Sequence, residues 1–204
     1  MTAYSIDGVS PVVHETAFVH PQASLIGDVV IGPECYIGPF ASLRGDFGRI
    51  DVRAGSNVQD SCTVHVFPGQ DTILEEGSHI GHGAVLHGCH LEPGVLVGMN
   101  SVIMDGTRIG PRSLVAAHSF VRAGGDYAAE SLIAGSPAKF IRRLDEVTLA
   151  WKANGADVYR ELAARSLASL REVTPLREVE PDRKRVSTGR DTSTPLHEIR
   201  AEGA

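Results

Sequence analysis

Apolar residues recur at every sixth position through most of the first 122 residues of the chain. The recurring residue is Val, Ile or Leu, and glycine often follows it, as in IGPECY, IGPFAS and VGMNSV. A period of six matches neither the 3.6-residue period of an amphipathic helix nor the two-residue alternation of a half-buried strand. These anchor positions are Val13, Val19, Leu25, Ile31, Ile37, Leu43, Val52, Val58, Val64, Leu74, Ile80, Leu86, Leu91, Val97, Ile103, Ile109, Val115 and Val121.

The period predicts short strands that are joined by tight corners and coiled into a solenoid. The pattern resembles that of the hexapeptide-repeat family, which implies a left-handed parallel β-helix with three hexads per coil. The 18 anchors then make about six coils. A β-sandwich is the alternative, but sandwiches do not keep one phase over this length. The predicted fold class is therefore all-β, a left-handed parallel β-helix with a C-terminal α-helix.

Breaks in the pattern divide the chain into three expected parts. Residues 1–143 form the β-helix with an exit strand, and residues 144–173 form a helical segment, as two helices broken near Gly155. Residues 174–204 form a polar, flexible tail. Within the repeats, insertions follow Leu43 and Val64 and carry GDFGRID and VFPGQD. Such insertions become loops on the outside of a solenoid, often near its binding face.

The hexad register predicts which side chains lie above one another, because successive coils stack about 4.8 Å apart. His65 and His87 each follow an anchor, and three hexads separate them, so they should stack on one face with Arg44 in the same column. Their imidazoles could converge on one metal ion. His82 stacks on Asp60 instead, on the adjacent face.

A three-fold trimer would bring these faces together. One subunit would supply His65 and His87, and its neighbour would supply His82. A three-histidine site that leaves a fourth position open is typical of a catalytic metal. His79 ends the preceding hexad, so we expect it in a turn, outside the site.

Composition narrows the classes of function. A net charge of −6 leaves no broad basic field for nucleic acid. No N-terminal export signal and no run of about 18 apolar residues is present, so we expect a cytoplasmic protein without a membrane span. Three widely spaced cysteines indicate a reduced protein rather than a disulfide framework.

Three segments together resemble the γ-class carbonic anhydrase family: SLRGDFGRI at 42–50, NVQDSCTVH at 57–65 and HIGHGAVLHGC at 79–89. Further segments, among them GSPAK, LAWK and PLREVEP, resemble a narrower group of that family, the proteins of phenylacetate degradation and of the carnitine operon. The resemblance implies a homotrimer with a divalent metal at each subunit interface, Zn with Fe or Co as alternatives, held by His65, His82 and His87.

The resemblance also implies roles for the residues around the metal. Arg44 would pair with an interface carboxylate, Asp60, and Asp46 would hold that network. Gln59 would hydrogen-bond the water or hydroxide on the metal. Tyr159 on the C-terminal helix would correspond to a tyrosine that reaches the metal pocket in some relatives.

Several functions fit this site. The first is a metal-dependent hydrolase, an acyl-CoA thioesterase of phenylacetate degradation, in which a metal-bound hydroxide attacks the thioester carbonyl. The second is a γ-type carbonic anhydrase, but Phe47 and the VFPGQD loop carry no proton-ferrying glutamate. Phe47 and Phe67 could instead line an apolar acyl site or anchor their loops. A hexapeptide acyltransferase without metal and a non-catalytic scaffold are the remaining alternatives.

Overall fold

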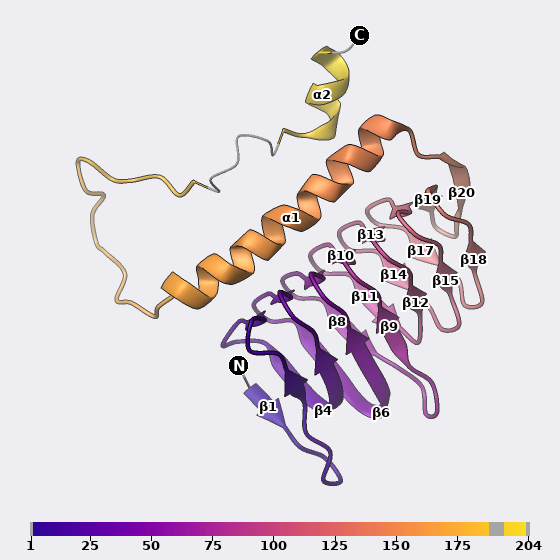
Figure 1. Cartoon of the computed structure of the whole chain (residues 1–204), viewed down its shortest axis with the longest axis horizontal. Helices are drawn as coiled ribbons and strands as arrows, with labels where there is room; N and C mark the ends of the chain where they lie inside the picture. The colour runs from indigo at the N-terminus through magenta and orange to yellow at the C-terminus, as the bar shows by residue number, and fades with distance from the viewer. Residues whose placement is uncertain (1, 188–193, 203–204) are drawn as a thin grey trace.

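The computed structural model describes residues 2–187 and 194–202, and its parallel strands stack into a β-helix with a long helix along one side (Figure 1). The stack beneath that helix is named the α1 face. Its strands are β3 (Phe18–Val19), β5 (Tyr36–Ile37), β7 (Asn57–Val58), β10 (His79–Ile80), β13 (Leu96–Val97), β16 (Leu114–Val115) and β19 (Ser131–Gly135).

Two further stacks complete the prism. The histidine face consists of the first halves of β4 (Ser24–Ile31) and β6 (Ser42–Val52), followed by β8 (Thr63–His65), β11 (Val85–His87), β14 (Val102–Ile103) and β17 (Phe120–Val121). The third face consists of β2 (Val12–Val13), the second halves of β4 and β6, β9 (Thr72–Leu74), β12 (His90–Leu91), β15 (Arg108–Ile109) and β18 (Asp126–Tyr127). β1 (Thr2–Tyr4) pairs with β4, and β20 (Ala138–Arg143) pairs antiparallel with β19.

The anchors of the six-residue repeat fill the interior of the prism. Leu25, Leu43, Val64, Leu86 and Ile103 are stacked one coil apart on the histidine face, and all of them are fully buried. Burying a side chain of this size contributes about 1.5–3 kcal/mol relative to leaving it in water. The predicted β-helix is therefore confirmed, and the repeat is the pattern of its core.

The solenoid continues beyond the six predicted coils. Tyr127 pairs in register with Ile109, and Ile133 pairs with Val115, so both occupy anchor positions of a seventh turn. The sequence pattern predicts that the repeat ends near residue 122; the anchor position that follows Val121 holds Tyr127 rather than an aliphatic residue. β19 is thus part of the stack, and only β20 leaves it.

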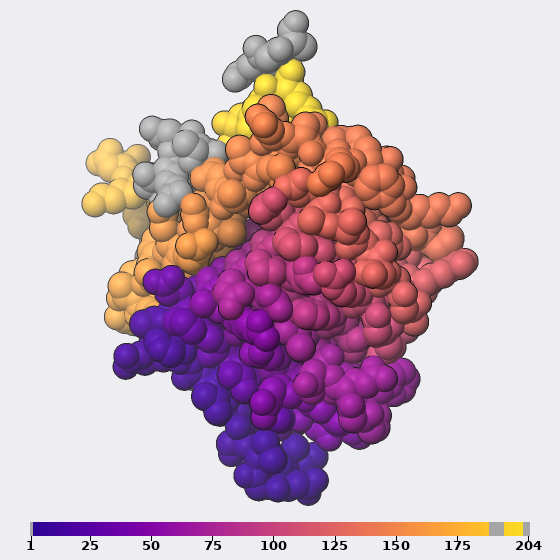
Figure 2. Space-filling view, turned by 45° about the vertical axis from the view of Figure 1, so that its right-hand side comes forward, coloured from indigo at the N-terminus to yellow at the C-terminus, as the bar shows by residue number. Residues whose placement is uncertain are grey.

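The C-terminal helix α1 (Glu146–Ser169) is continuous, so the expected break near Gly155 is wrong. Asp145 caps its N-terminus by accepting a hydrogen bond from the backbone N of Thr148 at 2.8 Å. The helix packs on Phe18 and Tyr36 of the α1 face, and its residues cover one side of the β-helix in space-filling view (Figure 2).

The described part of the segment after α1 is mostly irregular, with one short helix, α2 (Leu196–Glu202), that sequence reasoning did not predict. The division of the chain into three parts stays a prediction. Neither helix of the described residues has the length and apolarity needed to cross a bilayer.

Candidate functional site: two histidine clusters on adjacent faces

His65 and His87 lie side by side on the histidine face, as the register predicts. They are direct partners between β8 and β11, and Nδ1 of His65 lies 3.1 Å from Nε2 of His87. Both side chains are largely buried, with 12% and 21% of their surface exposed.

A carboxylate holds the far nitrogen of each ring. Oδ1 of Asp46 lies 3.0 Å from Nε2 of His65, and Oδ1 of Asp105 lies 2.5 Å from Nδ1 of His87. If each carboxylate accepts an N–H, the two remaining nitrogens face each other with their lone pairs. Carboxylates that orient histidines in this way are typical of metal sites.

Arg44 keeps Asp46 ionised. Its guanidinium donates a hydrogen bond of 2.7 Å to Oδ2 of Asp46. Burial alone would raise the pKa of Asp46, but the hydrogen bonds from Arg44 and His65 outweigh it, so the pKa lies below its usual value. Within one chain, Arg44 therefore pairs with Asp46. The expected ion pair between Arg44 and Asp60 would form between two subunits, so it stays a prediction.

Sequence reasoning missed Asp105, although the register contained a signal for it. The residue lies two places after the anchor Ile103, and it stacks over Gly88, two places after Leu86. A Cβ at Gly88 would lie 2.5 Å from Oδ1 of Asp105, and the backbone of Gly88 has a φ of +56°. Glycine is thus required where Asp105 reaches His87.

Two phenylalanines from the insertions lie against the histidine rings. The ring of Phe47 is 5.3 Å from that of His65, and the ring of Phe67 is 4.9 Å from that of His87. About half of each phenylalanine remains exposed. They form an apolar border around the histidine pair.

His82 lies apart from this pair, at the corner that follows β10. Its Nδ1 is 3.3 Å from Oδ2 of Asp60, and nearly half of its side chain is exposed. Among the described residues of one chain, no three His, Cys, Asp or Glu side chains are grouped so that they could hold a metal. The shared three-histidine site stays a prediction that requires a second subunit.

A second polar cluster lies under α1, and it contains Gln59 and Tyr159. Gln59 is buried, donates to Oδ1 of Asn57 at 3.0 Å, and has Nε2 2.8 Å from Nε2 of His79. The Tyr159 ring lies edge-on to His79 at 5.2 Å, and burial raises the pKa of Tyr159 to about 12. Within the described part of one chain, the polar and ring contacts of Gln59 and Tyr159 are made with Asn57, His79 and Tyr36, and not with the His65–His87 pair.

His79 is the centre of this cluster, so its expected place in a turn is wrong. It belongs to strand β10, and its Nδ1 lies 3.3 Å from Nδ2 of Asn57. Burial, with a smaller effect of Lys152, lowers the pKa of His79 to about 4. Its imidazole is therefore neutral near pH 7. The contacts depend on where α1 docks, which the repeat pattern does not show.

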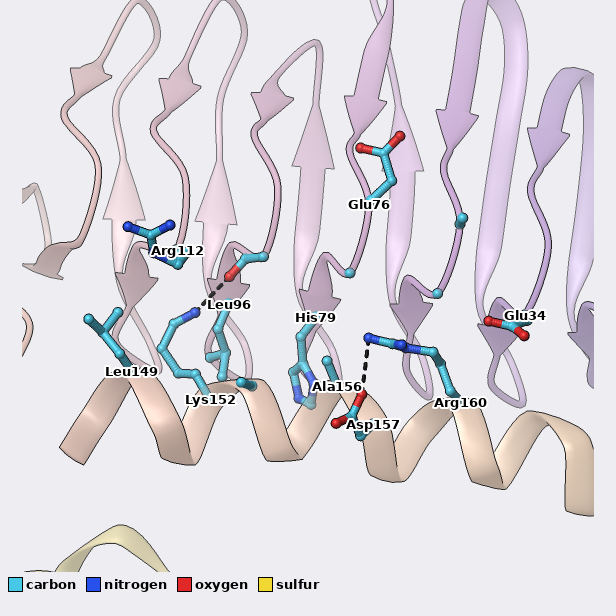
Figure 3. A pocket seen from close by; sticks show the side chains of 15 residues that line it. Glu34, Glu76, His79, Leu96, Arg112, Leu149, Lys152, Ala156, Asp157 and Arg160 are labelled. Atoms are coloured by element: carbon cyan, nitrogen blue, oxygen red, sulfur yellow. Dashed lines mark hydrogen bonds and ion pairs between the residues drawn. The ribbon is translucent and has the colours of Figure 1, made fainter. Parts of the chain in front are cut away.

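Pockets flank α1 on both sides. One, of about 340 Å³, opens beside His82 and is named the apolar pocket; Trp151, Tyr159, Leu96, Leu114 and Ala116 are among its lining residues. Another, of about 540 Å³, is named the charged groove, and Arg112, Lys152, Asp157 and Arg160 line it together with His79 (Figure 3).

Lys152 ties α1 to the solenoid in the charged groove. Its Nζ donates a hydrogen bond of 2.7 Å to the backbone O of Gly94, as the dashed line in Figure 3 shows. Only 6% of Lys152 is exposed, and burial together with the nearby Arg112 lowers its pKa to about 8.

Comparison with known proteins identifies the family. The family model described as bacterial transferase hexapeptide (six repeats) matches residues 10–45 and 88–123. The carnitine operon protein CaiE of Escherichia coli O7:K1 is 51% identical over 193 residues, which cover 95% of this chain and 98% of that protein. CaiE of Salmonella agona is 52% identical over 186 residues, which cover 91% and 94%.

Solved structures agree with these relatives. A hexapeptide transferase family protein from Anaplasma phagocytophilum is 37% identical, with a TM-score of 0.77, and the match covers 79% of this chain and 96% of that one. A Bacillus cereus protein named as a candidate acetyltransferase is 32% identical, with a TM-score of 0.81, over 82% and 97%. The chain therefore belongs to the hexapeptide-repeat family and is a relative of the carnitine operon protein CaiE.

Proposed function

We propose that this protein is a metal-dependent acyl-CoA thioesterase that acts as a homotrimer. His65 and His87 of one subunit and His82 of the next would hold a divalent metal, with Zn as the first candidate. The observation that carries the proposal is the pair of histidine nitrogens that face each other at 3.1 Å, each ring backed by a carboxylate.

The donor set fits a metal. Zn–N bonds of about 2.0–2.1 Å at tetrahedral angles place two ligand nitrogens about 3.3 Å apart. The observed 3.1 Å between the histidine nitrogens lies close to that separation. A 3.1 Å separation also suits an N–H···N hydrogen bond between the rings, so a cation would replace a proton at this point. His82, the proposed third ligand, is nearly half exposed, so it is accessible to a neighbouring chain.

The residues of the chain have separate tasks in this proposal. Asp46 and Asp105 hold the tautomers of His65 and His87, and Arg44 holds Asp46 in its charged form. Phe47 and Phe67 keep water away from the rings and offer apolar surface to a substrate. A divalent cation, when bound, supplies a Lewis acid for the thioester carbonyl and a nucleophile at neutral pH.

Two other activities have specific support. Names of the similar structures refer to acetyl transfer and hexapeptide transferases, which supports an acyltransferase as the second candidate. CO₂ hydration remains a third candidate through the resemblance to γ-class carbonic anhydrases. The relatives' name refers to carnitine rather than phenylacetate, so the phenylacetyl group is proposed as a probe and not as the physiological substrate.

The test compares three assays on one purified protein: release of free CoA from phenylacetyl-CoA, CO₂ hydration, and acetyl transfer to an amine. We expect CoA release that depends on bound metal. His87→Ala should lower it by more than the roughly 10–100-fold that loss of an orienting partner costs. His90→Ala is the matched control, because His90 lies on the third face and pairs with Glu75. Full thioesterase activity in metal-free protein would refute the proposal.

A further inference from the structure

The apolar pocket is a hollow between α1 and the α1 face, and His82 stands at its border. Trp151 and Tyr159 of α1 form one wall, and Leu96 and Leu114 belong to the strands β13 and β16 opposite. The pocket is therefore connected to the proposed site through His82, which contributes to its lining.

Small residues create this hollow. Along the α1 face, the residues directly after the anchors Ile80, Val97 and Val115 are Gly81, Gly98 and Ala116, whereas Gln59 occupies that place one coil earlier. The backbone explains the glycines, because a Cβ at Gly98 would lie 2.4 Å from the backbone N of Ala117. The small size of these residues leaves open space beside Trp151.

The apolar pocket and the charged groove differ in the charge of their lining residues. None of its lining residues is Lys, Arg, Asp or Glu. The cations Arg112, Lys152 and Arg160 lie in the charged groove instead (Figure 3). The partly buried rings of His79 and Tyr159, which also line the pocket, are neutral near pH 7, because burial lowers the pKa of His79 to about 4 and raises that of Tyr159 to about 12. Such a pocket suits an uncharged, apolar group.

The volume of the apolar pocket favours an organic acyl group over CO₂ as its ligand. The pocket encloses about 340 Å³, whereas one water in the liquid takes only about 30 Å³. A three-atom substrate such as CO₂ would leave most of this space unused. Pockets of roughly 300–1,000 Å³ are those in which proteins bind small organic molecules.

We propose that the apolar pocket is the acyl subsite, which binds the aryl or medium-chain acyl group of a thioester with its carbonyl toward His82. This inference rests on the proposed thioesterase function and adds the class of acyl group to it. Leu96, Leu114 and Trp151 would surround the acyl chain.

The test uses Trp151, which is the single tryptophan of the chain, as a fluorescent reporter inside the pocket. The probe is phenylacetamide, a neutral analogue of the phenylacetyl group. We expect a saturable change in Trp151 fluorescence. Ala116→Leu should fill the pocket and raise the Kd of phenylacetamide at least tenfold. Ala128→Leu, at the same position of a hexad on the third face, should leave Kd within twofold.

Kinetics give a second readout with the trimeric protein. Ala116→Leu should lower kcat/KM at least tenfold for phenylacetyl-CoA and less than twofold for acetyl-CoA. If Ala116→Leu fails to fold, Met99→Ala is the alternative, because Met99 is half-exposed at the border of the pocket. It should weaken phenylacetamide binding several-fold.

The outcomes distinguish the two proposals. Binding that Ala116→Leu abolishes, in a protein that hydrolyses no thioester, would refute the thioesterase function and support an apolar binding pocket. Hydrolysis of phenylacetyl-CoA that Ala116→Leu leaves unchanged would refute the acyl subsite and support the thioesterase. Absence of saturable binding in the unaltered protein would also overturn the subsite.

Discussion

Asp105 shows how a single side chain can orient a proposed metal ligand. When its carboxylate accepts the Nδ1–H of His87, the lone pair of Nε2 is directed toward His65. Asp46 does the same for His65 through the opposite ring nitrogen. The two rings therefore present different nitrogens to the same point, and each requires its own carboxylate.

We predict that Asp105→Asn lowers the affinity for Zn about 10–100-fold, because an amide replaces the negative charge that orients His87 and makes it more basic. Competition with a chromophoric chelator measures this affinity without an activity assay. Asp126→Asn is the control, since Asp126 pairs with Arg108 on the third face. Equal Zn affinity in Asp105→Asn and the unaltered protein would contradict the role of Asp105.

His79 should make the protein sensitive to acid. Its pKa is about 4 in the folded chain, against about 6.5 when unfolded. Between these values the unfolded chain binds a proton that the folded chain does not, so stability falls as pH falls from 6.5 to 4. The slope is at most about 1.4 kcal/mol per pH unit, or about 3 kcal/mol in all.

Urea unfolding at several pH values between 4 and 7 measures this dependence. His79→Gln should have a shallower slope than the unaltered protein over that window. His197→Gln should keep the original slope, because His197 is mostly exposed in α2. Parallel stability curves for His79→Gln and the unaltered chain would show that His79 is not the acid-sensitive group.

The helix α1 illustrates how tertiary contacts override local propensity. Gly155 costs about 1 kcal/mol relative to alanine in a helix interior, which is why a break was expected there. The helix nevertheless continues, since Tyr159 and Ala163 pack against Tyr36 and Phe18, and Lys152 bonds to Gly94. These contacts hold both sides of Gly155 on the same face of the solenoid.

Gly155→Ala should therefore stabilise the protein by about 0.5–1 kcal/mol, which corresponds to an increase in Tm of about 1–4 °C. The added Cβ would lie 3.8 Å from Cε1 of His79, an ordinary contact. Thermal unfolding measures the change. Gly77→Ala is the opposite control: it has space, but its φ of +67° should make the substitution destabilising by about 1–2 kcal/mol. A lower Tm for Gly155→Ala would mean that α1 needs glycine at this position.

If the proposed site is correct, a single chain cannot bring all three of its histidine ligands together. His65 and His87 lie on the histidine face, whereas His82 points from a corner of the α1 face toward Asp60. Heterologous contacts in a cyclic trimer can join two such different faces without any change in the fold. The apolar pocket beside His82 would then serve the histidine pair of the neighbouring subunit.

Mixed trimers test this sharing directly. Homotrimers of His82→Ala and of His87→Ala should each lack every complete site. Trimers that contain both kinds of subunit should recover one complete site, and thus about a third of the metal bound by the unaltered trimer. Tandem purification with two tags isolates the mixed trimers, and metal analysis gives the stoichiometry. Mixed trimers without any recovered metal would contradict the shared site.

The six-residue repeat was sufficient to predict the β-helix, its core and the adjacency of His65 and His87. Each of these depends on counting three hexads per coil, and the count holds although 22 residues separate His65 from His87, because the insertion after Val64 lies outside the hexads. The same register separated His82 from that pair and stacked it on Asp60. A solenoid makes such predictions possible because residues at the same hexad position of successive coils stack on one another, whatever the length of the loops between the hexads.

The remaining features depend on contacts that have no constant spacing. The position of His79 under α1, the continuity of α1 through Gly155, the apolar pocket and the charged groove all arise where the helix docks on the solenoid. The seventh turn, with Tyr127 as an anchor, was visible only through its pairing with Ile109. Local periodicity thus specified the coil and the stacked histidines, while packing between distant segments decided the surroundings of the site.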